Sequence, residues 1–280
     1  MRAQLWDPAS GVLQGTLRGA LGAVLDVTWS PDGKLVLGAG TDRALRLWEL
    51  SSGRVRHTLT GHGDKVVAAA FAPAADGERC YCAGHDRALK VWDVGRGYCL
   101  TTLLCASNVN CCAAGLAGGL LASGHFDGGV RFWDPRAASA AAGRAAHELA
   151  GLHPASQVTS CAACPRRGGG ELLTCGRDNA LRVVDVRTFG VVATMRHAAF
   201  RVGTNFARAA WAPDARHAAA GGADGAVCVW QLPPPGESEG RLAATLRGHA
   251  AAVAACAWSP AAAAQLGSCD KAGVTLLWEA

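Results

Sequence analysis

One strand ending recurs along the whole chain and limits what the chain can fold into. Each copy places a tryptophan after an apolar residue, with Val184 standing in the tryptophan position once. The tryptophan position returns after 41 to 51 residues, which is the period of units that each form one four-stranded sheet with loops of variable length. The endings are LWDP (5–8), LWEL (47–50), VWDV (91–94), FWDP (132–135), VVDV (183–186), VWQL (229–232) and LWEA (277–280).

An aspartate precedes most of these endings at a fixed distance. In the last unit Asp270 stands eight residues before Trp278, so we expect the turn there to be two residues longer. Short polar segments between apolar runs are turn signals, so this aspartate marks the turn between two strands. The aspartates that stand six residues before the tryptophan position are Asp42, Asp86, Asp127, Asp178 and Asp224.

Residues 61–104 show how one unit is built. Its short apolar runs are bounded by Gly, Pro and Asp, which is typical of strands joined by turns. One such sheet cannot bury its apolar faces alone, so it has to pack between neighbouring sheets of the same kind. The predicted strands are VVAAAF (66–71), RCYCAG (79–84), ALKVWD (88–93) and GYCLTTLL (97–104).

The predicted fold class is all-β: a WD-repeat β-propeller, a seven-bladed ring with an incomplete first blade and six complete repeat units. The first unit has only its closing strand, 3–7, and the outer strand that follows, 12–19. In the alternative, a six-bladed ring, strand 12–17 completes the last blade and AQLWDP is surplus. A surplus strand with the full ending favours seven blades truncated at the N-terminus. We expect one propeller domain over residues 1–280, with units ending near 7 (partial), 49, 93, 134, 185, 231 and 279.

Two units begin with Gly-His, at Gly61-His62 and Gly248-His249. Several units lack this histidine, and we expect their blades to be less tightly held; Leu21-Gly22, Ala106-Ser107 and His197-Ala198 stand in roughly that region. We predict that this histidine, the turn aspartate and the tryptophan form a buried hydrogen-bond chain, because buried polar groups need partners. A catalytic dyad is the weaker interpretation, since one active site does not need an aspartate in every unit. The residues assigned to these structural chains are Asp42, His62, Asp86, Trp92, Asp127, Trp133, Asp178, Asp224, Trp230, His249, Asp270 and Trp278.

Composition argues against several other classes of function. The net charge is only +5 and no Lys/Arg run exceeds two residues, whereas a nucleic-acid surface needs clustered positive charge with stacking aromatics. Residues 97–126 carry no charged side chain, but they lack the continuous apolar run of a transmembrane helix. No nucleophile elbow, phosphate loop or paired-carboxylate motif is present. We therefore expect no enzyme activity, no catalytic residues, no nucleic-acid partner and no membrane span.

The twelve cysteines require a separate explanation. No signal peptide precedes them, and most fall on predicted strands, so free thiols in a reducing cytosol are expected. Cys161 and Cys164 have metal-like spacing, but no second pair with comparable spacing follows. We expect no metal and no cofactor.

Longer segments resemble the C-terminal propeller of the autophagy-related protein 16-like family over nearly the whole chain. Two features are more specific than the repeat endings: the Val-Val-Asp-Val-Arg ending at 183–187 and the Asp-Lys turn at 270–271. The resemblance implies a seven-bladed propeller that follows a coiled coil and a partner-binding segment, both absent here. The similar segments are RHTLTGHGDKV (56–66), HDRALKVWD (85–93), SGHFDGGVRFWD (123–134), SCAACP…LLTCGRDNALRVVDVR (160–187), FRVGTNFARAAWAPD (200–214) and SCDKAGVTLLWE (268–279).

This resemblance implies a non-catalytic scaffold that docks membrane-protein tails and other partners for lipid conjugation of ubiquitin-like modifiers. The conjugation machinery would bind the upstream region, and a cytoplasmic protein would be recruited peripherally to autophagic or endolysosomal membranes. Three candidate partner-binding residues follow. Lys65 retains a basic position of the family and Phe126 retains part of a Phe-Asp pair, whereas Arg43 replaces a residue that is usually aromatic. Solvated turn charges and hairpin packing are the alternatives for these residues.

Two other functions remain open from the motifs. A substrate receptor of a cullin-type ubiquitin ligase is one, because such propellers end blades with Trp-Asp-x-Arg. Arg136 completes that motif and Arg187 completes a near match. A phosphoinositide-binding propeller is the other, although Val202 stands where the Phe-Arg-Arg-Gly motif has its second arginine, and the phosphate pocket thereby loses a charge.

Overall fold

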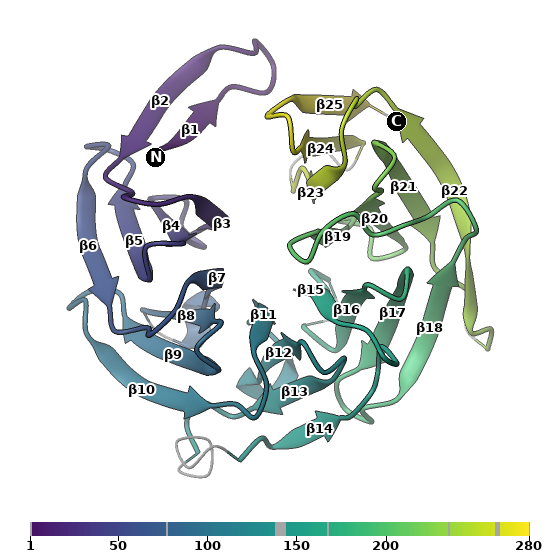
Figure 1. Cartoon of the computed structure of the whole chain (residues 1–280), viewed down its shortest axis with the longest axis horizontal. Helices are drawn as coiled ribbons and strands as arrows, with labels where there is room; N and C mark the ends of the chain where they lie inside the picture. The colour runs from purple at the N-terminus through teal and green to yellow at the C-terminus, as the bar shows by residue number, and fades with distance from the viewer. Residues whose placement is uncertain are drawn as a thin grey trace.

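The computed structural model describes residues 2–76, 78–137, 144–166, 168–234, 236–260 and 264–279. Met1 and Ala280, the outermost residues of the predicted domain, lie outside the described residues. Within the described ranges the regular elements are β-strands and two short 3-10 turns, η1 (Ala74–Asp76) and η2 (Ala117–Gly119). The sheets radiate around one axis as a propeller-like ring (Figure 1). The all-β propeller prediction is confirmed.

The chain forms one sheet after another around this ring. The first sheet pairs only β1 (Arg2–Trp6) with β2 (Leu13–Arg18). The next three are four-stranded: β3 (Val24–Trp29), β4 (Leu35–Gly40), β5 (Ala44–Glu49), β6 (Val55–Thr60); β7 (Val66–Phe71), β8 (Arg79–Gly84), β9 (Ala88–Asp93), β10 (Cys99–Leu104); β11 (Val109–Ala113), β12 (Leu121–His125), β13 (Val130–Trp133), β14 (His147–Leu149).

The last three sheets continue this order. The outer strands of two of them, β18 and β22, meet through a short parallel pairing at Thr194–Glu239 and Met195–Gly240. The last sheet has three strands among the described residues. The strands are β15 (Val158–Ala163), β16 (Glu171–Gly176), β17 (Ala180–Asp185), β18 (Val191–Arg196); β19 (Ala209–Trp211), β20 (His217–Gly221), β21 (Ala226–Gln231), β22 (Glu239–Arg247); β23 (Val253–Trp258), β24 (Gln265–Asp270), β25 (Thr275–Glu279).

The hydrophobic core lies between neighbouring sheets. One cluster joins Leu45 and Leu47 of β5 to Ala69 of β7, Cys82 of β8 and Trp92 of β9, all of them buried. Large and small apolar side chains from both sheets thus pack together in one cluster, as close packing requires. This arrangement explains why each unit carries apolar residues on both faces of its strands.

The strand register is the same in every complete repeat and corrects one prediction. Trp92 of β9 pairs with Cys80 of β8, and Trp278 of β25 pairs with Leu266 of β24. Both pairings join residues twelve positions apart, so the last turn is not two residues longer. Asp270 instead lies at the end of β24, where the equivalent residue of β8 is Gly84. Compared with the other sheets, the aspartate of the last sheet lies two positions earlier in the sequence, and the turn has the same length.

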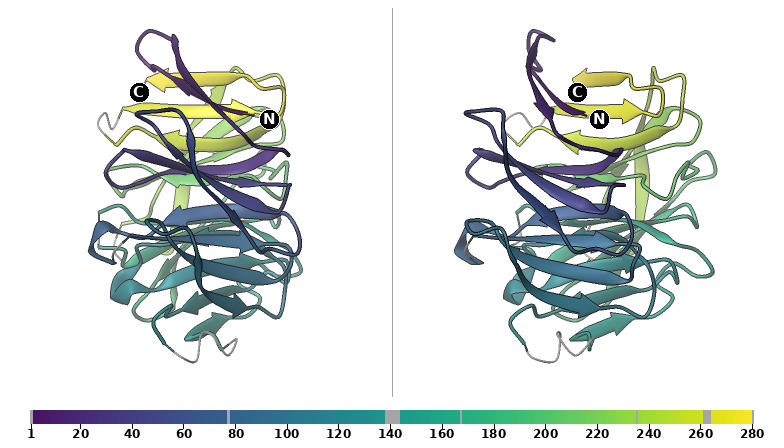
Figure 2. Two further views of the ribbon diagram at one scale, coloured as in Figure 1. Left: turned by 90° about the vertical axis from the view of Figure 1, so that its left-hand side faces the viewer. Right: turned by 60° about the vertical axis from the view of Figure 1, so that its left-hand side comes forward.

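The connections between strands gather at two rims (Figure 2). One rim carries the turn from the second to the third strand of each sheet and the link from each outer strand to the next sheet. We call it the aspartate rim, after the turn aspartates Asp42, Asp86, Asp127, Asp178 and Asp224. The other connections form the opposite rim. Arg43, Lys65 and Phe126 therefore lie at the aspartate rim, whereas Arg136 and Arg187 lie at the opposite rim.

The uncharged segment 97–126 contributes to β10, β11, η2 and β12. No helix in the ranges listed above as described is both long and apolar enough to cross a membrane.

Candidate functional site

The β7–β10 sheet contains a complete hydrogen-bond chain at its buried edge. Asp86 accepts hydrogen bonds from His62 Nδ1 at 2.9 Å and from the Gly63 amide at 2.8 Å. His62 Nε2 lies 2.9 Å from Cys82 Sγ, which accepts from the Trp92 indole at 3.2 Å. The histidine thus reaches the tryptophan through a fourth side chain, a link absent from the sequence prediction. The chain joins the link before β7 and the β8–β9 turn to the two strands β8 and β9.

The last sheet repeats this arrangement with a hydroxyl in place of the thiol. His249 Nδ1 lies 3.1 Å from Asp270 Oδ2, and His249 Nε2 lies 2.8 Å from Ser268 Oγ. Ser268 accepts from the Trp278 indole at 2.7 Å. Asp270 reaches the histidine although it stands two residues earlier than the other turn aspartates, because its side chain is buried beside the ring.

A third histidine of this type was missed by the sequence reasoning. His153 follows Gly151 by two residues, so no Gly-His pair marks it. Its Nδ1 lies 2.7 Å from Asp178 Oδ1 and its Nε2 lies 3.0 Å from Thr174 Oγ1. The chain ends there, because Val184 has no indole to donate.

The β11–β14 sheet builds its chain without the turn aspartate. His125, at the end of β12, donates from Nδ1 to the Ser107 carbonyl at 3.2 Å and accepts from Ser123 at 2.7 Å. Ser123 accepts from the Trp133 indole at 2.8 Å. Asp127 binds Arg131 at 2.8 Å instead of a histidine. Asp127 still serves the turn, because it accepts from the Gly129 amide at 2.9 Å, and it binds no histidine because Ala106-Ser107 stand where other units have Gly-His.

Two further sheets depart from the predicted chain. Asp42 binds Arg46 at 2.6 Å, while the Trp48 indole donates to the Arg18 carbonyl at 2.7 Å. Asp224 accepts from the Ala226 amide at 3.1 Å. The Trp230 indole is buried and has no hydrogen-bond partner among the described residues. Asp42 also accepts from the Leu21 amide at 3.0 Å, so Asp42 and Asp224 bind backbone amides as turn aspartates in units without the Gly-His pair. The assignment of Trp230 to a hydrogen-bond chain was wrong, because Ala220 on the neighbouring strand offers no side-chain acceptor.

One residue position in each repeat would have shown which sheets contain a histidine hydrogen-bond chain. The linking side chain always stands ten residues before the tryptophan position, on the second strand. Polar or thiol residues stand there where a histidine binds, and Gly38 and Ala220 stand there in the two sheets without one. The linking residues are Cys82, Ser123, Thr174 and Ser268.

Burial determines the charge of these groups. It lowers the pKa of His62 against the opposing pull of Asp86, and it lowers the pKa of His125 to about 4. Burial also acts to raise the pKa of Asp178, but hydrogen bonds from His153 and Arg182 hold that pKa at about 2. Neutral histidines that donate from Nδ1 hold these turns in place. Because the same arrangement recurs in several sheets, we infer that it stabilises the fold.

An aromatic and basic cluster lies at the aspartate rim. The Lys65 ammonium lies 5.7 Å from the centroid of the Phe206 ring. His85 stacks on Phe206 at 6.3 Å and meets the edge of Phe126 at 5.2 Å. These residues come from three different sheets, so the ring brings together Lys65 and Phe126, which the sequence reasoning named, with His85 and Phe206, which it did not name. We call these four residues the Lys65 surface.

The remaining predicted partner-binding residues lie apart from this surface. Arg43 is exposed in a turn with a positive φ of 63°. Arg136 binds Asp134 at 2.9 Å and the Gly118 carbonyl at 2.6 Å. Arg187 is 85% exposed and lies 3.8 Å from Asp185. Arg136 and Arg187 therefore cannot act together with Lys65 on one ligand.

Arg208 lies at the centre of the ring. Its guanidinium donates to the carbonyls of Asn110, Thr159 and Val67 at 3.2, 2.8 and 2.7 Å and lies 3.5 Å from Asp26. These partners belong to the inner strands of four other sheets. One side chain thus holds the inner strands together.

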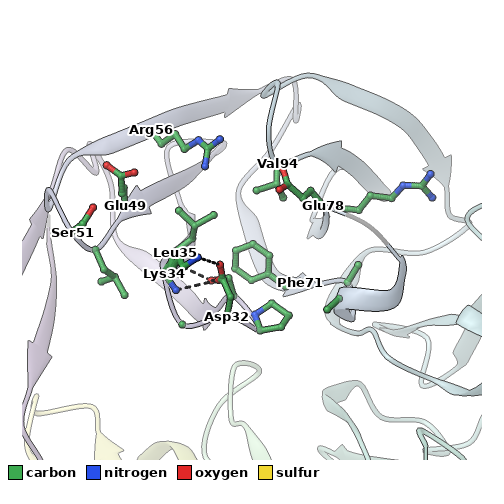
Figure 3. A pocket seen from close by; sticks show the side chains of 16 residues that line it. Asp32, Lys34, Leu35, Glu49, Ser51, Arg56, Phe71, Glu78 and Val94 are labelled. Atoms are coloured by element: carbon green, nitrogen blue, oxygen red, sulfur yellow. Dashed lines mark hydrogen bonds and ion pairs between the residues drawn. The ribbon is translucent and has the colours of Figure 1, made fainter.

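A groove of about 670 Å³ opens at the opposite rim between the β3–β6 and β7–β10 sheets (Figure 3). Leu35, Phe71 and Val94 give it an apolar lining, and charged side chains such as Arg56 and Glu78 surround them. Cationic and anionic groups are mixed around this groove, so its charge selects no particular ligand.

The cysteines carry free thiols. Cys161 lies on β15 with its sulfur 3.3 Å from that of Cys111 on β11, and Cys164 is buried beyond the end of β15. Burial raises the pKa of several of these thiols, that of Cys80 to about 12. Across the part of the chain that the structure describes, no group of three or more His, Cys, Asp or Glu side chains is placed to hold a metal ion.

Comparison with known proteins agrees with this architecture. The WD domain, G-beta repeat family matches residues 11–49, 53–93, 97–134 and 202–231, which together exceed half of the chain. Among solved structures, a chain of the "Crystal Structure of Mitotic Checkpoint Complex" superposes with a TM-score of 0.83 at 20% identity. That match covers 100% of this chain and 81% of the other, and it shows the shared fold.

Several similar curated proteins match nearly the whole chain. Autophagy-related protein 16 of Arabidopsis thaliana is 38% identical over 98% of this chain and 51% of its own length. Protein tipD of Dictyostelium discoideum is 36% identical over 99% of this chain and 43% of its own. Protein Atg16l2 of Mus musculus is 32% identical over 91% of this chain and 38% of its own. The chain thus spans about half the length of these relatives or less. It belongs to the WD domain, G-beta repeat family, as a WD-repeat domain of the autophagy-related protein 16-like type.

Proposed function

We propose that this domain is a non-catalytic scaffold that docks protein partners for lipid conjugation of ubiquitin-like modifiers at autophagic membranes. The observation that carries the proposal is the similarity to autophagy-related protein 16 of Arabidopsis over 98% of the chain. The conspicuous Asp, His and Trp side chains support it, because they bind one another inside the blades. We therefore expect other molecules to contact the rims, because binding residues commonly lie in loops.

The Lys65 surface is the proposed docking site. It offers a cation beside aromatic rings, a combination that binds both the aromatic and the acidic side chains of a peptide tail. Phe126 is half-buried and Lys65 comes from the same rim, so one extended peptide can contact both. Arg43 lies at the same rim, in the turn between β4 and β5 of the neighbouring sheet.

The full-length protein in its own cells provides the test. Deleting this domain should lower the membrane-bound, lipid-conjugated fraction of the modifier, measured by gel mobility after fractionation. Lys65→Glu should lower it likewise, whereas Arg187→Glu on the opposite rim is the matched control and should leave it unchanged. An unchanged conjugated fraction after deletion of the whole domain would refute the proposed function. A deletion effect without a Lys65→Glu effect would refute only the docking surface.

The opposite-rim motif receives a structural explanation. Arg136 is bound to Asp134 and to the Gly118 carbonyl, so the Trp-Asp-x-Arg motif serves the fold of its own blade. Val202 is buried at the position that a phosphoinositide motif would fill with arginine. Neither alternative function gains an observation in its favour.

We also propose that the ring has seven positions, one of them only half filled by β1 and β2. Val27 on β3 is 52% exposed, whereas its equivalents Ala69 on β7 and Cys256 on β23 are 7% and 6% exposed. The strands that would cover Val27 in a complete blade are the inner two, and Figure 1 places β1 and β2 between β3 and the β23–β25 sheet. A crystal structure with β2 hydrogen-bonded to β25 would establish the six-bladed alternative instead.

A further inference from the structure

A polar pocket of about 460 Å³ opens at the aspartate rim beside the β15–β18 sheet. Its side chains come from three places: the turn between β16 and β17, the end of β18 and the link from β18 to β19. Two arginines and a histidine line it together with a single carboxylate. The lining residues are Asp178, Asn179, Arg196, His197, Ala198 and Arg201.

The carboxylate of the pocket is already paired inside the blade. Arg182 Nη1 lies 2.8 Å from Asp178 Oδ2, and His153 Nδ1 lies 2.7 Å from Asp178 Oδ1. Arg196 is farther away, at 3.6 Å, and is 59% exposed. Because the buried Arg182 balances Asp178, the exposed guanidinium groups leave the pocket with a net positive charge.

Arg201 is held in a rigid segment. Phe200 is fully buried and Val202 is 6% exposed, so the residues on both sides of Arg201 are anchored. The Val202 amide donates to Asn179 Oδ1 at 2.8 Å, and Arg177 donates to the Val202 carbonyl at 2.9 Å. Arg201 itself is exposed, and its guanidinium donates to the Phe200 carbonyl at 3.0 Å. A cation that is already positioned loses little freedom when a ligand binds.

We propose that this pocket binds an acidic segment of a partner protein, with Asp or Glu carboxylates of that segment bound by Arg196 and Arg201. Arginine suits this role because its planar guanidinium matches carboxylate geometry. A nucleic-acid strand fits less well, since the aromatic rings beside the pocket, Phe200 and Trp230, are buried and cannot stack on bases.

This site goes beyond the proposed conjugation function. It shares the aspartate rim with the Lys65 surface but uses other residues, and it is tested on the purified 280-residue chain without any autophagy protein. If the experiment below fails, the conjugation proposal is therefore unaffected. If the conjugation experiment fails, the proposal for this pocket is likewise unaffected.

The test uses a fluorescein-labelled peptide of six glutamates and fluorescence anisotropy at low salt. We expect saturable binding that weakens as salt is added, since exposed ion pairs are screened. Arg196→Gln and Arg201→Gln should each weaken binding by about fivefold, because an exposed ion pair contributes up to about 1 kcal/mol. Arg187→Gln on the opposite rim is the matched control and should bind like the parent chain.

A charge reversal separates specific binding from a folding defect. The double variant Arg196→Glu, Arg201→Glu should lose the six-glutamate peptide and bind a six-lysine peptide instead. Inorganic phosphate that displaces the peptide at equal concentration would overturn the proposal in favour of a free-anion site. Binding to phosphatidylserine vesicles without binding to the peptide would overturn it in favour of a membrane. Equal affinity of the parent chain and both single variants would overturn it as well.

Discussion

At the scale of single residues, one turn position has several different partners. Asp86 meets a histidine, Asp42 an arginine and Asp224 a backbone amide, although all three stand six residues before the tryptophan position. The sequence spacing places the carboxylate, and the neighbouring side chains decide what it binds. The stabilising effect of each aspartate should therefore differ from sheet to sheet.

Asp86→Ala should lower the free energy of unfolding by about 1–3 kcal/mol, because the buried His62 Nδ1–H and the Gly63 amide lose their acceptor. Urea denaturation of the purified chain measures this loss. Asp224→Ala is the matched control at the same turn position, with a carboxylate that is 45% exposed, and it should cost less. Equal midpoints for Asp86→Ala and the parent would contradict the hydrogen-bond chain.

His125 should make stability depend on pH. Its folded pKa is about 4 because the ring is buried, whereas an unfolded histidine titrates near pH 6.5. Between these values the unfolded chain binds the extra proton, so stability is present at neutral pH and is lost as the pH falls below 6.5. The loss attributable to His125 between pH 7 and pH 5 should be about 2 kcal/mol.

Denaturation of the parent and of His125→Gln at both pH values checks this expectation. The variant should lose less stability on acidification than the parent, because glutamine has no proton to gain. Identical losses in the two proteins would show that other groups account for the acid sensitivity.

At the scale of elements, neighbouring sheets approach closely where a strand carries a small residue. β22 runs for nine residues, and its first part pairs in parallel with β18 of the preceding sheet. Gly240 sits at that contact, where an added Cβ would lie 2.6 Å from Met195 Cγ. The pairing of these outer strands therefore depends on a missing side chain.

Gly240→Ala should lower the melting temperature, since the added methyl group forces Met195 and the Gln231 carbonyl to move, at a cost of about 1–3 kcal/mol. Gly15→Ala in β2 is the matched control, because its Cβ would make only an ordinary 3.5 Å contact with Leu5. Scanning calorimetry of both variants tests the difference. A Gly240→Ala protein as stable as the control would remove the steric argument.

At the scale of the whole molecule, the ring is held at its centre and along its sheet-to-sheet interfaces. Arg208 binds the inner strands of several sheets and pairs with Asp26. Asp26 is largely buried, and burial raises the pKa of its carboxyl group while the Arg208 charge opposes that rise. One residue thus couples the folding of units that are distant in the chain.

Arg208→Met should destabilise the protein by about 3 kcal/mol, because it leaves the Asp26 carboxylate buried without a cation. Adding Asp26→Asn should restore part of that loss, and a double-mutant cycle from urea denaturation gives the coupling. The exposed Arg54→Met serves as the matched control, with little change expected. Strictly additive effects of the Arg208 and Asp26 changes would show that the two residues do not interact across the ring.

The sequence by itself determined the strands and their order. The run VVAAAF (66–71), the run RCYCAG (79–84) and the tryptophan endings coincide with strands, because short apolar runs and the turn residues that bound them act within a few positions of one another. Features that depend on strand pairing could not be predicted from such local patterns. The sequence analysis placed His62 and Asp86 together but missed His153, and it misjudged the turn after Asp270, since pairing register is not visible in spacing alone.

Only the tertiary structure decided which distant residues meet. Arg208 and Val67 are 141 positions apart and still share a hydrogen bond, and Phe206 reaches Lys65 from another sheet. Such contacts arise when the sheets arrange around one axis and bring every inner strand to the same centre. Repeated local patterns build the blades, whereas ring geometry selects the contacts at the centre and at the rims.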